Sequence, residues 1–398
     1  MRLLHTSDLH LGRAFHGGVL QTEQEAVIES LVAAAAYGQV DLVVIAGDLF
    51  DRAIPPLEAV GLFDDTIVRL RGTGAAVVAI SGNHDSARRV GVHDRLLAAA
   101  GVTIRGDVSR CDEVVLLSPD DGGGEVAVYA VPYLDPYSST KILSHFSEPG
   151  DPEPSARPRR LSHDSITRLA MDRVRVDRAS RPGTRTIVVA HTFVAGGTPS
   201  ESERDLSVGT IDHVGLDAFD GFDYVALGHL HGPQAFAGGR IAYSGSPLPY
   251  SFSEESHDKS ARLVELGPAG SVGVELVPLD VGMRLRTITG ELEGLLVDPG
   301  WSEAESARVR VVLTDVQMPV HAMARLRARF PMAVELRHQP AGGSEQSLSG
   351  SIAARDRDLA PIELVREFWS DQHPTELSEG EWALLTEALG AVAGSEDP

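Results

Sequence analysis

The chain has 398 residues, of which 42% are hydrophobic and 23% charged, so it has the composition of a globular protein and the length of two or three domains. Its single cysteine, Cys111, excludes an internal disulfide and a metal site built from several thiolates. The formal net charge of −22 repels polyphosphate over most of the surface, so a nucleic acid would have to be attracted by local patches, bound cations or a partner.

Two features of the sequence bear on location and partners. Residues 1–20 lack the basic start and apolar run of a signal peptide, and no stretch reaches the roughly 18 apolar residues of a membrane span, so we expect a cytoplasmic protein with no membrane contact. The segment from Arg157 to Arg185 holds nine arginines against three aspartates. It is either a patch for an anionic partner or the solvated face of a helix beside a polar loop.

The first 280 residues predict one α/β domain with parallel strands. Uniformly apolar strands are expected at residues 2–6, 41–46, 75–80, 126–131, 186–190 and 223–227. One helix is expected from a capping box at Thr22 and Glu25 to about Tyr37, and another over residues 57–71. A proline- and serine-rich stretch at 147–160 interrupts this domain as a surface loop.

Beyond about Val281 the pattern changes to a small α+β module, residues 281–340. Its predicted elements are a strand at 307–315, a helix at 320–330 and a strand at 332–339. A glycine- and serine-rich linker at 341–360 then leads to terminal helices within residues 361–398. The expected helices are residues 361–371 and residues 378–393, the second opened by a capping box of Ser378 and Glu381.

Polar side chains follow the ends of five apolar strands. They are Asp8 and His10 in SDLH, Asp48 and Asp51 in GDLFD, Asn83, His84 and Asp85 in SGNHDS, His191 in VVAHT, and His229 and His231 in GHLH. Each motif alone fits an ordinary turn or strand exit. Because ligands of open parallel sheets bind beyond the carboxyl ends of the strands, we expect all five motifs to meet at one edge.

These residue types suit a pair of divalent cations. Two such ions about 3.5 to 4 Å apart need a carboxylate that bridges them, and Asp48 is the candidate. We expect one ion to bind Asp8, His10, Asp48 and His231, and the other to bind Asp48, Asn83, His191 and His229. Four imidazoles favour manganese, iron or zinc over magnesium or calcium. Two carboxylates against two dications leave a net positive site for a phosphate diester.

His84 lies beside a predicted ligand but is not needed as one. We predict that it stabilises the transition-state oxygens or protonates the leaving oxygen, and that Asp85 orients its imidazole. Asp51 and Arg52 are assigned to the structure of the loop.

The series DxH, GD, GNHD, H and GHxH resembles the calcineurin-like metallophosphoesterases. The longer stretches HTSDLHLGRAF, IAGDLFDRAIPP, ISGNHDS, DYVALGHLHGPQ and YSGSPLPYSFSEE are similar to the SbcD-type nuclease subunits of bacteria, counterparts of the eukaryotic Mre-eleven type nucleases. The resemblance covers residues 1 to about 280. It implies an α/β fold, a sandwich of β-sheets flanked by helices, with a small α+β capping domain and C-terminal helices.

The resemblance also implies a function. Such subunits are manganese-dependent DNA nucleases of repair, recombination and replication, with 3′-to-5′ double-strand exonuclease, single-strand endonuclease and hairpin-opening activities. The family pattern implies the same two ligand sets and places its catalytic histidine at His84. It further implies a cytoplasmic, nucleoid-associated homodimer within a heterotetramer with an SbcC-like coiled-coil ATPase. The two terminal helices either dock on that coil or pack on their own domain through Ile362, Val365, Trp369, Trp382, Leu385 and Leu389.

Two other functions stay open. The same metal site would serve a phosphodiesterase or phosphatase for small nucleotides, although such a substrate needs neither the 281–340 module nor terminal helices. A non-catalytic scaffold with the same fold is the third possibility, and it predicts lost ligands, whereas all seven are present.

Overall fold

The computed structural model describes residues 1–143, 161–203, 213–340, 378 and 380–386. Residues Met1–Pro340 form one compact unit and Ala341–Pro398 a second. The predicted surface loop at 147–160, the linker at 341–360 and the helix near 361–371 lie outside the described residues.

The first of two large sheets is built on the N-terminal apolar strands. In spatial order its six strands are β14 (Val272–Pro278), β13 (Ser260–Leu266), β1 (Arg2–Thr6), β4 (Leu42–Ile45), β5 (Ala76–Ile80) and β6 (Val102–Arg105). Strands β1, β4, β5 and β6 are parallel neighbours, whereas β13 and β14 extend the sheet in antiparallel fashion. The carboxyl ends of β1, β4 and β5 therefore lie at the same edge.

The second sheet repeats this plan with the later strands. In spatial order its six strands are β11 (Gln234–Phe236), β12 (Ile241–Tyr243), β10 (Tyr224–Gly228), β9 (Arg185–His191), β8 (Val126–Val131) and β7 (Val114–Leu117). The four inner strands are parallel, and the two outer strands pair with them in antiparallel fashion.

The two sheets pack face to face as a sandwich. Because successive side chains of a strand point to opposite faces, Leu3 lies in the cluster between the sheets while its neighbour Leu4 lies in the cluster under the helices. The inter-sheet cluster is rich in fully buried β-branched side chains, such as Val44, Val128 and Val189. The six strands predicted for residues 1–280 are confirmed. They divide between two sheets, and each sheet buries one face against the other sheet and its second face under helices.

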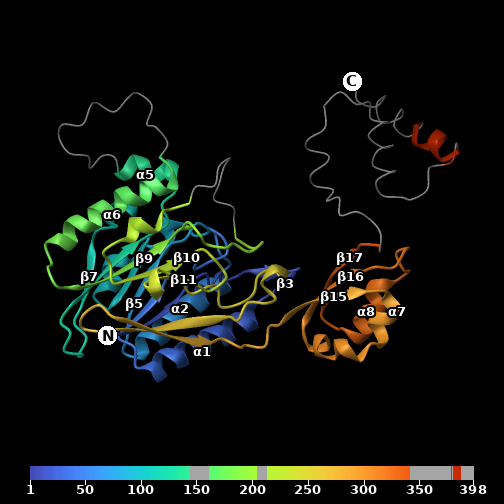
Figure 1. Cartoon of the computed structure of the whole chain (residues 1–398), viewed down its shortest axis with the longest axis horizontal. Coiled ribbons are helices and arrows are strands. Elements are labelled where there is room, and N and C mark those ends of the chain that lie inside the picture. The colour runs from blue at the N-terminus through green and yellow to red at the C-terminus, as the bar shows by residue number, and fades with distance from the viewer. Residues whose placement is uncertain (144–160, 204–212, 341–377, 379, 387–398) are drawn as a thin grey trace. The chain divides into compact units, whose positions relative to one another are not determined.

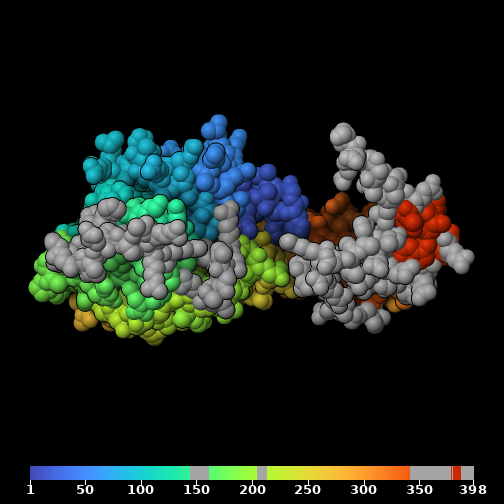
Figure 2. Space-filling view, turned by 90° about the horizontal axis from the view of Figure 1, so that it is seen from above, coloured from blue at the N-terminus to red at the C-terminus, as the bar shows by residue number. Residues whose placement is uncertain are grey.

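Helices cover the outer face of each sheet. The first sheet is covered by α1 (Gln21–Gly38) and α2 (Leu57–Gly72), and the second by α5 (Pro136–Leu143) and α6 (His163–Ala179) (Figure 1). Figure 2 shows these layers from above, with blue to cyan residues on one side and green residues on the other. The remaining elements of this region are β2 (Ala14–Phe15), β3 (Gly18–Val19), α3 (Ala87–Val90), α4 (Asp94–Ala98), η1 (Val108–Arg110), η3 (Leu216–Phe219), η4 (Ala237–Gly239) and η5 (Phe252–Glu254).

Both helices predicted for the N-terminal region are confirmed, but the capping box at Thr22 and Glu25 is wrong. The helix α1 begins at Gln21, and no side chain caps it. Its start is fixed by tertiary contacts: the Gln24 side-chain amide donates to the backbone carbonyl oxygen of His10 at 2.8 Å and accepts from the backbone N–H of Gly12 at 3.0 Å. Those two bonds require Gln24 in the first turn, which places Thr22 inside the helix.

The 281–340 module has a three-stranded parallel sheet of its own. Its elements are β15 (Leu285–Gly290), α7 (Leu292–Val297), η6 (Pro299–Ser306), β16 (Arg308–Leu313), α8 (Ala322–Arg329) and β17 (Ala333–His338). The predicted helix and two strands are confirmed, while β15 and α7 were not predicted. Buried side chains such as Val309, Leu326 and Phe330 give the module a separate hydrophobic cluster, and the domain boundary at residue 281 stays a prediction.

The described part of the second terminal helix confirms its predicted start. Ser378 donates its backbone N–H to the Glu381 carboxylate at 2.8 Å, and its hydroxyl accepts from the Glu381 N–H at 3.4 Å, which is a capping box. Residues 380–386 are helical. Among the helices that the structure describes, none combines the length and apolar character needed to cross a bilayer.

A buried histidine joins the two sheets away from the predicted ligands. His5 of β1 contacts the Tyr224 hydroxyl through Nδ1 at 3.0 Å and the Leu227 carbonyl oxygen through Nε2 at 3.1 Å, both in β10. A carbonyl only accepts, so Nε2 carries the proton and Nδ1 accepts from the tyrosine. Burial, together with the charge of Arg262, lowers the pKa of His5 to about 3.

We expect His5 to make folding sensitive to mild acid. The unfolded chain protonates this residue near pH 6.5 and the folded chain does not, so the stability that it contributes is complete above that pH and is lost as the pH falls toward 3. The loss by pH 5 is on the order of 2 kcal/mol. Urea denaturation of the metal-free protein at pH 7 and pH 5 measures it.

The variant His5→Gln should lose less of its unfolding free energy over the same interval. The matched control is His93→Gln at an exposed position, which should behave like the unsubstituted chain. An identical acid dependence of His5→Gln and the unsubstituted chain would contradict this account.

Candidate metal centre

The five polar motifs converge where the carboxyl ends of the two sheets meet. The backbone N–H groups of Asp8 and His10 donate to the carbonyl oxygens of Gly47 and Asp48, both at 3.0 Å, so pairing between the loops continues beyond β1 and β4. Across the sheets, the backbone N–H of His229 donates to the Asp8 carboxylate at 3.1 Å. The predicted convergence is therefore confirmed, at an edge shared by two sheets.

Four of the predicted ligands have an unusual backbone conformation. Asp8, His10, Asp48 and His229 have positive φ angles of 54°, 43°, 47° and 112°. The left-handed region is unfavourable for residues other than glycine, and such residues cluster at functional sites because the surrounding structure must hold them there. Here the positive φ angles change the direction of the loop backbone, so that side chains close together in the sequence point into the same buried region.

Glycines next to the ligands are required by close packing. At Gly82 a Cβ atom would collide with the carboxylate of Asp48, and at Gly47, which has a φ of 93°, it would collide with the ring of His191. The glycines of the GD and GN motifs thus allow a ligand from a neighbouring strand to approach the backbone.

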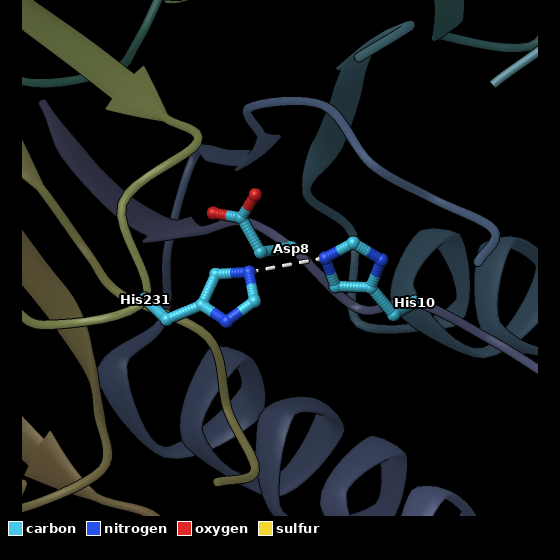
Figure 3. A group of neighbouring side chains, drawn as sticks. All are labelled: Asp8, His10 and His231. Carbon is cyan, nitrogen blue, oxygen red and sulfur yellow. Dashed lines mark hydrogen bonds between the residues drawn. The ribbon is translucent and has the colours of Figure 1, made fainter. Parts of the chain in front are cut away.

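One group of donors is formed by Asp8, His10 and His231. The Nε2 atoms of the two imidazoles lie 3.2 Å apart, and Figure 3 shows Asp8 beside the line that joins the two rings. One ligand atom from each residue lies within 4.8 Å of the others, and all three side chains are buried. These residues, with Asp48, are the set predicted for the first ion.

Asp48 lies at the centre of the second group. Its Oδ2 atom is 3.5 Å from His191 Nε2, 3.7 Å from His10 Nε2 and 4.0 Å from His84 Nε2. The side-chain oxygen of Asn83 lies 2.9 Å from His191 Nε2 and 3.3 Å from His229 Nδ1. All seven predicted ligands are therefore brought together, while the assignment of each to one ion stays a prediction.

Hydrogen bonds at the far side of three imidazoles fix which nitrogen faces the site. His191 donates its Nδ1–H to the Ala46 carbonyl oxygen at 2.8 Å, and His84 donates its Nδ1–H to the Asp51 carbonyl oxygen at 2.8 Å. The Nδ1 atom of His231 lies 2.6 Å from the Ser202 hydroxyl. In their neutral forms these rings present an Nε2 lone pair to the site, as metal ligands do.

The pKa values of the two carboxyl groups shift in opposite directions. Burial would raise the pKa of Asp48, but its charge interaction and hydrogen bond with His191, and the proximity of His10 and His84, lower it well below its ordinary range. Burial raises the pKa of Asp8 to about 6, although nearby histidines oppose the rise. Burial would lower the pKa of His191, whereas the Asp48 carboxylate raises it to about 9.

Two neighbouring imidazoles are harder to protonate than usual. Burial and the adjacent histidines lower the pKa values of His10 and His229 well below their ordinary value. Neutral imidazoles with free lone pairs are the form that binds metal ions. Among the described residues, moreover, His10 Nδ1 is a buried polar atom with no hydrogen-bond partner.

These residues fit a pair of divalent cations. The donor set combines two carboxylates, four imidazoles and one amide oxygen around a buried space, and thiolate is absent from it. A cation bound there would replace the proton on His191 and offset the charge of two buried carboxylates. The mixed nitrogen and oxygen donors are typical of transition-metal sites rather than of calcium or magnesium sites.

The role predicted for Asp85 is wrong. Its carboxylate accepts three backbone N–H groups, from Leu49 at 3.0 Å, Phe50 at 2.9 Å and Gly82 at 2.8 Å. It therefore holds two ligand loops together, and the hydrogen bond expected to orient His84 is made by the Asp51 carbonyl oxygen instead. Burial and the Asp48 charge raise the pKa of Asp85 to about 7.

The arginine-rich segment does not form a free basic patch in the part that is described. Arg168, Arg173, Arg175, Arg181 and Arg185 pair with aspartates at 2.6 to 3.0 Å. Arg178 lies over the ring of Phe222 instead. The structure thus favours the solvated helix face over the anion-binding patch for the described residues.

Sequence reasoning assigned no role to a group of polar residues behind His231. Glu254 and Lys259 form a buried ion pair, and Ser202 and Glu203 contact His231 directly. Burial would raise the pKa of Glu254, but the Lys259 ammonium holds it well below its ordinary range. The only signal in the sequence was the stretch YSGSPLPYSFSEE, which includes Glu254 but carries no recognisable ligand spacing.

The sequence profile of the family described as calcineurin-like phosphoesterase matches residues 1–233, so the chain belongs to this family. Within it, the chain is similar to the SbcD component of nuclease SbcCD from Staphylococcus epidermidis, with 28% identity over 376 residues, which are 94% of each chain.

Solved structures resemble the chain more distantly. The protein GAP50 of Plasmodium, titled as the anchor in the inner membrane complex, is 12% identical with a TM-score of 0.43, covering 86% of this chain and 98% of its own. A dimetal phosphatase from Danio rerio is 14% identical with a TM-score of 0.36, covering 70% and 99%. At these scores the resemblance has no bearing on the site.

Replacing Asp48 tests the centre of this site directly. The variant Asp48→Asn should bind divalent cations at least about 100-fold more weakly, because it loses the carboxylate that three histidines surround, whereas an outer-shell partner alone costs 10–100-fold. Titration of the metal-free protein with Mn²⁺ by calorimetry, with bound metal counted by mass spectrometry, measures the change.

The control is Asp112→Asn, which removes a carboxylate paired with Arg173 on the second sheet's outer layer. It should bind Mn²⁺ as the unsubstituted chain does. Unchanged cation binding by Asp48→Asn would show that the Asp48 carboxylate is not a metal ligand, although the other donors lie around it.

Proposed function

We propose that the chain is a two-metal DNA nuclease, the SbcD-like subunit of a complex with an SbcC-like ATPase in DNA repair and recombination. The observation that supports the proposal most is the meeting of seven metal-binding donors, of which the Asp48 carboxylate is the central one. The similarity to the SbcD component of nuclease SbcCD extends over 94% of both chains and so includes the 281–340 module as well as the metal centre.

A phosphodiester is the substrate that this site suits chemically. When bound, two divalent cations polarise phosphoryl oxygens and activate water for in-line attack. Two ligand carboxylates leave such a site with net positive charge, which attracts a phosphate diester. Four imidazoles favour manganese, iron or zinc over magnesium or calcium, and of these we propose Mn²⁺ because the resemblance to SbcD-type nucleases implies it.

His84 has the geometry of a proton donor to the leaving oxygen. Its Nδ1–H is held by the Asp51 carbonyl oxygen, and its Nε2 faces the site 4.0 Å from the Asp48 carboxylate. In its protonated form the ring carries a transferable proton on Nε2. The backbone N–H of His84 also donates to Asp48 at 2.8 Å, so the main chain of His84 is tied to the centre.

A homodimer is part of the proposal. Large hydrophobic side chains are exposed on the segment that includes α2 and α4: Ile54 at 68%, Leu57 at 83%, Val92 at 67% and Leu96 at 76%. A contiguous patch of exposed apolar side chains is typical of a protein interface, and we propose that these four belong to one. Contact between two copies there would bring two metal centres into one particle.

The proposed activity is tested on end-labelled duplex, hairpin and single-stranded DNA with Mn²⁺ or Mg²⁺, with and without the candidate ATPase. We expect 3′-to-5′ degradation of duplexes and hairpin opening in Mn²⁺. Hydrolysis of cyclic nucleotides without any degradation of DNA would instead favour the alternative, a phosphodiesterase for small nucleotides.

The variant His84→Gln separates chemistry from metal binding. It should lower hydrolysis by about 10²- to 10⁴-fold, since it removes the proton donor, while two cations remain bound. Loss of both cations from this variant would make His84 a ligand and contradict its assigned role.

Deleting residues 361–398 tests whether this segment binds the ATPase partner. Within the described part of this segment, Trp382 and Leu385 are half-buried on one helix face. The truncated chain should keep its Mn²⁺-dependent nuclease activity and fail to associate with the ATPase in size-exclusion chromatography. Co-elution of the truncated chain with the ATPase would exclude docking through these helices.

A further inference from the structure

Glu254 is a buried charged residue that the proposed reaction does not use. Its side chain has no exposed surface, and that of its ion-pair partner Lys259 is 7% exposed. Glu254 ends η5, and Lys259 directly precedes β13. Both lie behind His231, on the side of the imidazole that faces away from the other ligands.

Every donor of the Lys259 ammonium is used within this cluster. It donates to the Glu254 carboxylate, to the His231 carbonyl oxygen at 2.9 Å and to the Ser246 hydroxyl at 2.9 Å. An ammonium has three N–H donors, so the lysine is fully satisfied and holds both the carboxylate and the backbone of His231.

Ser202 connects Glu254 to the imidazole. A hydroxyl has one proton, and Ser202 donates it to Oε1 of Glu254. The hydroxyl oxygen can then only accept from His231 Nδ1, which lies 2.6 Å away. The proton of the neutral ring is thereby fixed on Nδ1, and Nε2 carries a lone pair.

The backbone of His231 is held by the same cluster. Its N–H donates to Glu203 at 2.7 Å, and its carbonyl oxygen accepts from Lys259. Since both the ring and the peptide groups are fixed, Nε2 is aimed at the space shared with His10 Nε2, 3.2 Å away. A buried ion pair often adds little stability, so its placement around one ligand points to the ligand's geometry.

We propose that Glu254, acting through Ser202 with Lys259 as its counter-ion, is a positioning residue that fixes His231 as an Nε2 ligand of the first cation. The inference rests on the proposed function. It requires that the affinity of one cation depends on Glu254, whereas the affinity of the cation bound through Asn83, His191 and His229 does not.

Calorimetric titration of the metal-free full chain with Mn²⁺ tests this, with electron paramagnetic resonance of the bound ion as a second readout. We expect Glu254→Gln to weaken one of the two binding events by 10–100-fold and leave the other unchanged, as for other outer-shell partners of histidine ligands. Ser202→Ala should have the same selective effect, and Ser202→Thr, which keeps the hydroxyl, should restore the affinity.

The matched control is Glu255→Gln, one residue away, whose carboxylate accepts from the Thr287 backbone N–H at 2.7 Å and does not belong to the cluster. It should bind both ions normally. If Glu254→Gln leaves Lys259 unpaired and does not fold, the double variant Glu254→Gln/Lys259→Met removes the charge, and it should show the same selective loss.

Two results would overturn this inference but not the proposed function. The first is normal affinity for both ions in Glu254→Gln and Ser202→Ala. The second is an equal loss of affinity at both ions, which would indicate a general structural role. No Mn²⁺ binding by the unsubstituted chain would overturn the proposed function as well. The two failures are thus distinguishable in one titration series.

Discussion

The structure depends on keeping one negative charge, the Asp48 carboxylate, in a buried space at the edge shared by two sheets. Burial opposes that charge, and three histidines within 4.0 Å make it favourable. Two of those histidines come from loops that follow strands of the first sheet and one from the end of a strand of the second, so the two sheets have to end at the same place. The positive φ angles of four ligands are the conformational cost of that arrangement, and the surrounding hydrogen bonds hold them in place.

Much of this could be read from the sequence because the chemistry is concentrated at strand ends. Apolar runs such as 126–131 predict parallel strands buried on both faces, and parallel strands deliver their carboxyl ends to one edge. Asp8 and His231 are 223 positions apart and follow strands of different sheets. The rule places each of them at the carboxyl edge of its own sheet, and the packing of the two sheets brings them together. The rule helps because uniformly apolar strands indicate burial on both faces, which is typical of parallel sheets.

What could not be predicted depends on contacts between segments distant in sequence. Thr22 and Glu25 have the spacing of a capping box, but the bonds of Gln24 to the loop at residues 10–12 decide where the helix starts. Asp85 follows His84 directly, yet its carboxylate turns to three backbone N–H groups. Glu254 is one of many acidic residues in the sequence, and only the fold shows that it lies behind a ligand.

The ligands also join the two halves of the sandwich. His191 of the second sheet donates to the Ala46 carbonyl oxygen of the first, and Asp8 of the first accepts from His229 of the second. Cations bound by residues from both sheets would add links between the sheets. Any ligand that binds only the folded chain raises the free energy of unfolding by mass action. The increase is roughly 2.7 kcal/mol when the ligand concentration is a hundred times the dissociation constant. Cation binding would therefore raise the melting temperature, so the occupancy of the metal centre can be followed without any substrate.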